Sequence, residues 1–366
     1  MRPLVILLFI SALAANLSAQ AQQGDQKKEK KKKDQSAQVD LTPHEAARIF
    51  TAETPLTFTL TANYGRLRKD KGQDAPWRWA TITYADPDSA GANVEIPLKV
   101  KTRGIWRLRE CDFPPLRLDF AKNTVKHSLF AKLDKPKLVT HCRDNEDYEQ
   151  YVLQEMQLYR VYNLLTQFSN RVRVAKVVYA DSGSGKIIAT RYAFLEEEPA
   201  ALAHRVGGLL VKEKGASPAD LEPNAAVIFA VFQYMIGNTD WSVNGLHNVE
   251  LVNTTLGYVP IAYDFDFSGA VDTRYATVDP RLPIRRVRDR LYRGYCMPNE
   301  IYEPTFALFK AKRDSIKALY SDSIGQLLKG NRAKETLEYF DEFYETINDP
   351  RMARREIVDR CLSGKF

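Results

Sequence analysis

The sequence predicts an α+β protein in which strands dominate the first half of the chain and helices dominate the second half. Three observations support this prediction. Between residues 56 and 141, apolar and polar side chains alternate with a period of two, which is typical of half-buried strands. From residue 148 onwards, longer segments repeat their apolar residues every three or four positions, as helices do. The 366-residue chain also carries 18 Tyr and 17 Phe, enough large side chains for a substantial core.

The N-terminal residues are predicted to form a cleavable signal peptide over residues 1–21. A basic start precedes an apolar run at residues 4–15, and Ala-Gln-Ala at residues 19–21 has the small-x-small pattern of a signal-peptidase site. The apolar run is shorter than the roughly 20 residues that a membrane-spanning helix needs. We therefore expect an exported protein, periplasmic or extracellular, whose mature chain has no transmembrane anchor. An uncleaved N-terminal anchor is the alternative.

Residues 22–39 are predicted to be a disordered, lysine-rich linker, because they show no apolar periodicity. Residues 1–39 hold seven basic and three acidic side chains, a net charge of +4. The whole chain carries +7, so the remainder carries only +3. Since much of the positive charge lies in the tail, the composition gives no reason to expect a nucleic-acid partner.

The chain has four cysteines, Cys111, Cys142, Cys296 and Cys361, and no pair has the close spacing of a zinc or redox motif. An even number of cysteines in an exported chain predicts disulfides. We expect Cys111 to pair with Cys142 and Cys296 with Cys361, because each pair lies within one half of the chain. Free buried thiols are the alternative.

The part from residue 40 to residue 197 is expected to be rich in strands. Alternating β-branched and aromatic residues predict strands at residues 56–60, 79–84, 94–101, 116–120, 137–141, 173–179 and 187–194. Residues 181–186 are predicted to form the turn between the last two strands. Residues 148–165 predict a helix whose apolar face includes Glu155. Because a buried carboxylate is costly without a partner, we expect a cation or donor from a neighbouring strand to meet Glu155.

The part from residue 198 to residue 366 is expected to be mainly helical. Residues 225–236 are apolar on all sides, which predicts a helix buried in the core. A polar loop at residues 237–248 then leads into a short hairpin, and two amphipathic helices end the chain. The hairpin strands are predicted at residues 249–252 and 258–263, and the last helices at residues 305–328 and 333–347.

Acidic and amide side chains gather at the two ends of this predicted hairpin. Asp240 and Asn248 precede its first strand, whereas Asp264 and Asp266 follow its second strand. Side chains at the two open ends of a hairpin converge, and their oxygens are the ligands that hard divalent cations such as Mg²⁺ prefer. A further Asp beside such a cation can accept the proton of a hydroxyl, which is the chemistry of phosphoryl transfer.

These motifs resemble the catalytic and metal-binding loops of the CotH-type atypical kinases and, around the same loops, the HipA-type kinases. The similarity rests on Gly-Asn-Thr-Asp at residues 237–240 and Tyr-Asp-Phe-Asp at residues 263–266. Upstream, Val-Lys-Thr-Arg-Gly at residues 100–104 and Phe-Pro-Pro-Leu-Arg-Leu-Asp-Phe at residues 113–120 resemble the early strands of CotH-type proteins. The resemblance covers roughly residues 94–269. It implies a two-lobed protein-kinase-like fold, with a strand-rich N-lobe over residues 40–197 and a helix-rich C-lobe over residues 198–366.

The resemblance also implies roles for the acidic residues. Asp240 would orient the acceptor hydroxyl, and Asn248 and Asp264 would bind the metal with help from Asp266. Such families place the Asn five residues after the Asp, whereas Asn248 and Asn244 lie eight and four residues after Asp240. Which Asn binds the metal therefore stays open. Asp240 is alternatively a turn residue, and the two later carboxylates are alternatively ligands of a structural Ca²⁺.

The nucleotide side of the site follows from the same resemblance. Glu155 would pair with the lysine that positions the nucleotide, for which Lys137 is the candidate and Arg117 the rival. Arg103 and Gly104 would lie near the phosphates. Glu155 is alternatively paired with an arginine for stability alone. The His residues show no metal-binding spacing and receive no role.

The resemblance therefore implies a kinase that transfers a phosphoryl group from ATP or another nucleotide, with Mg²⁺ or Mn²⁺, to a hydroxyl of an unknown protein or envelope acceptor. A glycine-rich phosphate loop is absent from the sequence. Together with the unusual spacing between Asp and Asn, this absence keeps a second possibility open. In that alternative the chain is a non-catalytic binding protein or a structural protein of the cell envelope.

Overall fold

Seven strands form the first half of the chain in the computed structural model, which describes residues 42–72, 74–87 and 91–364. The expected signal peptide and lysine-rich linker lie outside the described residues. The strands follow the order β1-β2-β3-β4-β5-β7-β6 and close into a barrel. Their bounds are β1 (Leu56–Ala62), β2 (Arg78–Ala85), β3 (Asn93–Thr102), β4 (Leu116–Asp119), β5 (Lys137–Val139), β6 (Val172–Asp181) and β7 (Ile187–Glu196).

The barrel closes through a parallel pairing of β1 with β6, which runs from Leu56 opposite Ala175 to Ala62 opposite Asp181. The other neighbouring strands pair antiparallel. A closed barrel of seven strands is not the sheet of a two-lobed protein-kinase-like fold, so that predicted fold class is wrong. The alternating pattern locates each strand but carries no information on which strand edges meet, and closure joins strands that are distant in the sequence.

The interior of the barrel is filled by apolar side chains. Alternate residues of β1 are buried, as are those of β2 and β4, and aromatic rings occupy the centre. Phe130 packs edge-on against Phe58 and Tyr84, with ring centroids 6.3 and 5.2 Å apart. Because this interior is a packed core, polar groups on the barrel lie on its outer face or at its ends.

Helices and a small sheet make up the rest of the described chain. The sheet has the order β10-β9-β8, and its middle and outer strands β9 and β10 form the predicted hairpin. Strand β8 was not predicted. These strands are β8 (Leu209–Val211), β9 (Val249–Thr254) and β10 (Gly257–Ala262), and the longer helices are α5 (Glu146–Leu165), α6 (Pro199–Arg205), α7 (Pro223–Ile236), α8 (Tyr302–Ala318), α9 (Arg332–Asn348) and α10 (Pro350–Glu356).

Shorter turns of helix join these elements. Helix α8 stops at Ala318, ten residues before the predicted end, and a separate turn follows it. The short helices are α2 (Tyr64–Leu67), α3 (Trp106–Glu110) and α4 (Lys122–Val125), and the 3-10 turns are η1 (Arg48–Phe50), η3 (Pro218–Asp220), η4 (Asn299–Ile301), η5 (Gly325–Leu327) and η6 (Val358–Arg360).

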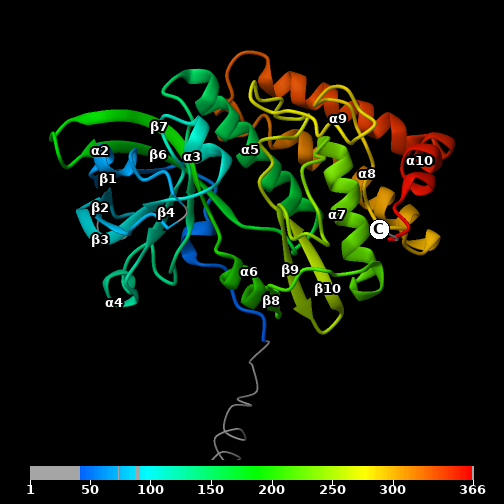
Figure 1. Ribbon diagram of the computed structural model, residues 1–366, viewed down its shortest axis with the longest axis horizontal. Coiled ribbons are helices and arrows are strands. Elements are labelled where there is room, and N and C mark those ends of the chain that lie inside the picture. The colour runs from blue at the N-terminus through cyan, green and yellow to red at the C-terminus, as the bar shows by residue number, and fades with distance from the viewer. Residues whose placement is uncertain (1–41, 73, 88–90, 365–366) are drawn as a thin grey trace, which may run out of the picture. The chain divides into compact units, whose positions relative to one another are not determined.

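Helix α5 is buried on all of its faces and contacts strands β6 and β7 as well as helices α7 and α8. Figure 1 shows it between the barrel strands and the other long helices. Its polar side chains find partners inside this packing: Gln157 donates to the carbonyl of Leu319 at 2.8 Å, and Gln150 donates to the carbonyl of Leu327 at 3.2 Å. Tyr162 stacks on Phe232 of α7 at 4.2 Å. The helix therefore holds the two halves of residues 43–366 together as one compact unit.

The predicted disulfides are confirmed: Cys111 pairs with Cys142, and Cys296 pairs with Cys361. Such bonds are typical of proteins that fold in an oxidising compartment. Within residues 42–364 that the structure describes, no helix is both long and apolar enough to cross a bilayer.

The two disulfides differ in burial, which predicts the order of their reduction. Cys111 and Cys142 are 2% and 3% exposed, whereas Cys296 is exposed. Since a thiolate must reach a sulfur atom to reduce it, a mild thiol reductant should open Cys296–Cys361 first and leave Cys111–Cys142 intact until the protein unfolds. Alkylation of the native protein followed by mass spectrometry measures this order. Early labelling of Cys111 would contradict it.

Candidate functional site

The two ends of the β9–β10 hairpin bring the predicted acidic and amide residues together. Val249 pairs with Ala262 across the hairpin, and the amide of Tyr263 donates to the carbonyl of Asn248 at 3.2 Å. Asn248 and Asp264 both have left-handed backbones, with φ of 51° and 62°. Asn and Asp tolerate this conformation better than other residues with side chains, and such backbones concentrate at functional sites.

Asp240 lies against Asn248, as the predicted convergence requires. The side-chain nitrogen of Asn248 donates to the carbonyl of Asp240 at 2.8 Å and to its carboxylate at 3.1 Å. With its amide nitrogen turned to Asp240, Asn248 keeps its oxygen for another partner. Asn248 is buried whereas Asn244 is exposed, so Asn248 is the Asn that shares this site.

His247 also contacts Asp240, although no role was expected for it. Its Nε2 lies 2.8 Å from a carboxylate oxygen of Asp240, and this hydrogen bond raises the pKa of His247. The contact arises because Ser242 and His247 pair across the turn that precedes β9. The one feature of the sequence that places His247 near the site is that it directly precedes Asn248.

A second group of acidic residues lies deeper. Glu155 and Asp266 are 2% and 5% exposed, and Asp266 accepts a hydrogen bond from the hydroxyl of Tyr275 at 3.0 Å. Burial and the neighbouring carboxylates raise the pKa of Asp266 to about 7 and that of Glu155 well above its ordinary value. Asp264 adds its charge to both groups, and its amide donates to the hydroxyl of Tyr159 at 2.9 Å.

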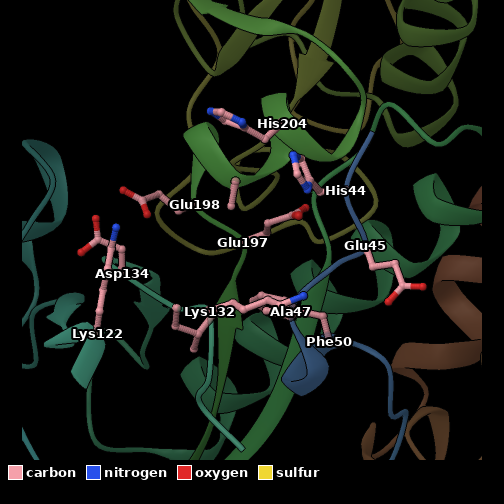
Figure 2. Close-up of a pocket in the computed structure, with 12 residues that line it drawn as sticks. His44, Glu45, Ala47, Phe50, Lys122, Lys132, Asp134, Glu197, Glu198 and His204 are labelled. Carbon is pink, nitrogen blue, oxygen red and sulfur yellow. The ribbon is translucent and has the colours of Figure 1, made fainter. Parts of the chain in front are cut away.

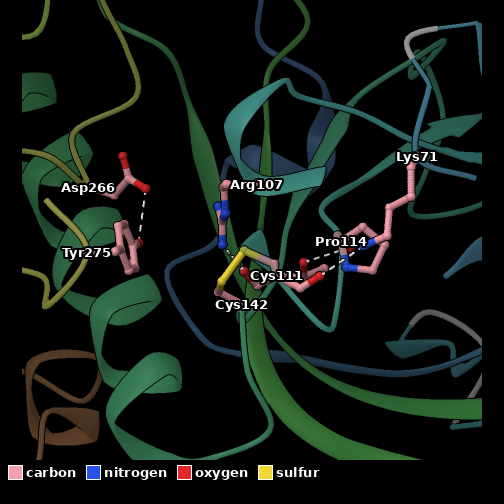
Figure 3. Close-up of a disulfide and its surroundings, with 8 residues drawn as sticks. Lys71, Arg107, Cys111, Pro114, Cys142, Asp266 and Tyr275 are labelled. Carbon is pink, nitrogen blue, oxygen red and sulfur yellow. Dashed lines mark hydrogen bonds between the residues drawn. A yellow bond between two sulfur atoms is a disulfide. The ribbon is translucent and has the colours of Figure 1, made fainter. Parts of the chain in front are cut away.

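Arg107 is the cation that acts on this buried acidic group, and the sequence analysis did not single it out. Its charge lowers the pKa values of Glu155 and Asp266, and in turn the carboxylates and Tyr275 hold its own pKa above the ordinary value despite burial. Figure 3 shows Arg107 between the disulfide and the pair formed by Asp266 and Tyr275. The guanidinium also donates to the carbonyl of Thr140 at 2.5 Å.

The Cys111–Cys142 disulfide fixes the segment that carries Arg107. Cys111 directly follows α3, and Cys142 lies just beyond β5, so the bond ties α3 to the end of a barrel strand. The amide of Phe113 donates to the carbonyl of Cys142 at 3.1 Å, and the amine of Lys71 donates to the carbonyl of Cys111 at 3.4 Å. The disulfide therefore restrains the helix that carries Arg107.

Lys137 pairs with Glu196 at 2.7 Å and not with Glu155. Its amine also lies over the ring of Tyr263, 4.2 Å from the centroid, and Asn170 donates to the same Glu196 oxygen at 3.1 Å. Among the described residues, none forms a hydrogen bond or ion pair with the Glu155 carboxylate. The expected partner for Glu155 is thus replaced by the longer-range charge of Arg107.

Arg117, a rival candidate for pairing with Glu155, lies in a row of cations on neighbouring strands of the barrel. Lys101 lies opposite Arg117, and Arg117 lies opposite Lys137 on the next strand. Arg117 and Lys137 act electrostatically on Glu250 of the hairpin, and Arg103 acts on Tyr263. In the described part of the chain, neither Arg103 nor Arg117 has a side-chain hydrogen bond or ion pair, and both Nε atoms are buried without a partner. Gly104 follows Arg103 with φ of 89°.

Two cavities are possible places for the candidate site, and both are lined by charged residues. One, of about 390 Å³, is lined by Asp240, His247 and Phe267 together with Asp279, Arg281 and Arg293, and it provides space beside Asp240. The other, of about 490 Å³, appears in Figure 2 and is lined by His44, His204, Glu197 and Glu198 among others. Since none of the sequence-predicted site residues lines the second cavity, we place the candidate site at the first.

The oxygen ligands at the hairpin suit a hard divalent cation that is held partly by the protein and partly by its substrate. Among the described side chains, no three His, Cys, Asp or Glu residues are grouped so as to hold a metal by themselves. Mg²⁺ needs no such group, because one or two carboxylates plus substrate phosphates commonly bind it. Asp264, Asp266 and the Asn248 oxygen are hard ligands, and the repulsion of the two carboxylates with Glu155 favours an added positive charge.

The raised pKa of Asp266 predicts a dependence of stability on pH. In the folded protein this carboxyl keeps its proton up to about pH 7, whereas its ordinary pKa is 3.8. The stability that its protonation contributes is therefore lost progressively as pH rises between these two values, and it is gone above pH 7. Asp266→Asn cannot ionise but keeps an acceptor for Tyr275. We expect the variant to lose less stability between pH 5 and 8, a difference of roughly 2–4 °C in Tm. Exposed Asp314→Asn is the control, and parallel curves for all three proteins would contradict the assignment.

Comparison with known proteins identifies no family for this chain. The chain matches no protein-family model, and no curated protein sequence matches it. The resemblance to the CotH-type and HipA-type kinases therefore rests on the motifs quoted above, and it remains an expectation. Function must be argued from the site itself, because a site and not a fold carries chemistry.

Proposed function

We propose that this chain is an exported phosphotransferase that uses a divalent cation to move a phosphoryl group from a nucleotide to a hydroxyl. One observation carries the proposal: acidic and amide ligands gather at the ends of one hairpin, and two arginines of the barrel segment act electrostatically on Glu250 and Tyr263 of the same hairpin. Asp240, Asn248 and Asp264 supply the first group, and Arg103 and Arg117 supply the second. Export is supported by the N-terminal sequence and by the two disulfides.

The charges on the two sides of the site complement a nucleotide bound with a metal. Guanidinium groups match the geometry of phosphate oxygens, and Arg103 and Arg117 have donors to spare. Asp264, Asp266 and Asn248 would hold Mg²⁺ or Mn²⁺, which when bound neutralises charge on the transferring phosphoryl group. Phosphoryl transfer depends mainly on such positioning and neutralisation, so no covalent nucleophile from the protein is needed.

Asp240 is the residue that we propose accepts the acceptor's proton. The acceptor oxygen forms a bond to the terminal phosphorus, its proton passes to the Asp240 carboxylate, and the bond to the bridging oxygen breaks as nucleoside diphosphate leaves. His247 and Asn248 hold this carboxylate from two sides, at 2.8 and 3.1 Å. The cavity of about 390 Å³ beside Asp240 offers the acceptor a place to bind.

A non-catalytic binding role is the second candidate, and one observation favours it. Both carboxylate oxygens of Asp240 are already engaged, one by His247 and the other by Asn248. A carboxylate so occupied is a weaker proton acceptor unless one contact opens when the acceptor binds. In this alternative, the chain binds a nucleotide or another phosphorylated ligand as a pseudokinase-like or envelope protein without transferring its phosphate.

The decisive experiment uses the mature protein with terminally labelled nucleotide, a mixture of envelope and protein acceptors, and Mg²⁺ or Mn²⁺. We expect transfer of label by the wild type, and a loss of roughly 100-fold or more in Asp240→Asn, because it removes the proton acceptor. Nucleotide binding, followed as a thermal shift, should persist in Asp240→Asn. Asp264→Asn should lose the metal dependence of that shift.

Asp314→Asn, which changes an exposed carboxylate on α8, is the matched control and should behave as the wild type. Metal-dependent binding without transfer in the wild type would favour the binding role. If no nucleotide shifts the Tm with either metal, the phosphotransferase proposal fails, and so does the binding role for a nucleotide.

A further inference from the structure

A cavity of about 260 Å³ lies at a part of α5 away from the candidate site, and arginines from two elements line it. Arg160 comes from α5, Arg173 comes from β6, and Arg171 immediately precedes β6. Arg160 and Glu155 are five residues apart on α5, which separates them by roughly 140° around a helix. The cavity is therefore a different place from the group around Glu155 and Asp266.

Two of these three arginines have no acidic partner. Arg160 forms an ion pair with Asp322 at 2.6 Å. Arg171 donates to the neutral side chain of Asn163 at 2.6 Å, and Glu197, whose charge acts on Arg171, is bonded by two nitrogens of Arg205 at 2.9 Å each. In the part of the chain that the structure describes, no carboxylate lies within ion-pair distance of Arg171.

Arg173 is more deeply buried and also lacks a carboxylate. Among the described residues, its terminal nitrogens donate hydrogen bonds only to neutral oxygens, namely the carbonyls of Ile49 and Ala52 and the hydroxyl of Thr54. Its Nε is buried without a partner. The residue is 6% exposed. Burial lowers the pKa values of both Arg171 and Arg173, as expected for cations whose lost hydration no anion replaces.

A carboxylate of the protein already reaches this cavity from outside. Glu53 lines the cavity and approaches Arg160 at 3.4 Å, although its own side chain is 81% exposed. A long contact from an exposed side chain is weak, so an anion from solution competes with it easily. The cavity is also lined by apolar side chains, including Phe50, Met156 and Leu164, which accommodate a small organic body.

We propose that this cavity binds a small organic oxyanion, through a phosphate or carboxylate group held by Arg171 and Arg173. The guanidinium groups of these residues supply forked donors that match either group, and the bound anion replaces Glu53 beside Arg160. The ligand adds the negative charge that Arg171 and Arg173 lack. The proposal does not depend on phosphotransferase activity, because none of the lining residues belongs to the candidate site.

The test measures the affinity of the mature protein for inorganic phosphate and for citrate by calorimetry, with chloride at matched ionic strength as the reference. We expect Arg171→Gln to weaken binding at least tenfold, whereas Glu53→Gln should strengthen it two- to fivefold by removing the competing carboxylate. Lys176→Gln removes an exposed charge from the same strand and should leave affinity unchanged. Glu53→Gln keeps the test informative even if an arginine variant folds poorly.

Binding of phosphate alone identifies a phosphorylated ligand, and binding of both ions identifies a general oxyanion site; either supports the proposal. Equal affinities of Arg171→Gln and Lys176→Gln overturn it, as does the absence of binding by either ion. Arg103→Gln separates this cavity from the candidate site. If Arg103→Gln abolishes phosphate binding while Arg171→Gln does not, the anion binds elsewhere and the proposal is overturned.

Discussion

The complete burial of α5 is the constraint on which the arrangement of this protein depends. A helix that contacts barrel strands on one side and long helices on another must satisfy every polar side chain within the protein. Gln150 and Gln157 do so by binding backbone carbonyls near η5, and Tyr159 accepts the amide of Asp264. Through Tyr159, the packing of α5 fixes the position of a residue at the end of the β9–β10 hairpin.

Glu155 is a buried residue of α5 whose carboxylate has no hydrogen-bond partner among the described residues. It lies near the carboxylates of Asp264 and Asp266, and the guanidinium of Arg107 offsets part of their charge. Such a group is costly to maintain, since each carboxylate raises the pKa of the next. Groups of this kind concentrate at functional sites, where a ligand supplies the missing charge. The energetic argument for a cation at this position thus rests on the same residues as the geometric one.

Local features of the chain could be predicted from the sequence. The strands β1 to β7, the helices α5 and α7, the hairpin and both disulfides all lie where alternation, helical periodicity and cysteine spacing place them. Long-range pairing could not be predicted. The parallel contact of β1 with β6 closes the barrel, yet the pattern of either strand would be the same in an open sheet.

The candidate site divides in the same way. The convergence of Asp240 and Asn248 follows from hairpin geometry, which is local, whereas the partners of Lys137 and Glu155 depend on how distant strands are ordered. Strand β7 brings Glu196 beside Lys137, so Glu155 is left to Arg107. The role of Arg107 could not be recognised from the sequence, because an arginine on a short polar helix has the same sequence pattern as an ordinary surface residue.

The disulfide between Cys111 and Cys142 affects when the candidate site can form as well as how it is arranged. Arg107 is the cation that offsets the buried acidic group, and the segment that carries it is tied to the barrel by this bond. A newly made chain with reduced thiols has all the residues of the site but lacks the tie. Formation of this disulfide is therefore expected to precede the full assembly of the candidate site, which ties that assembly to conditions in which disulfides form.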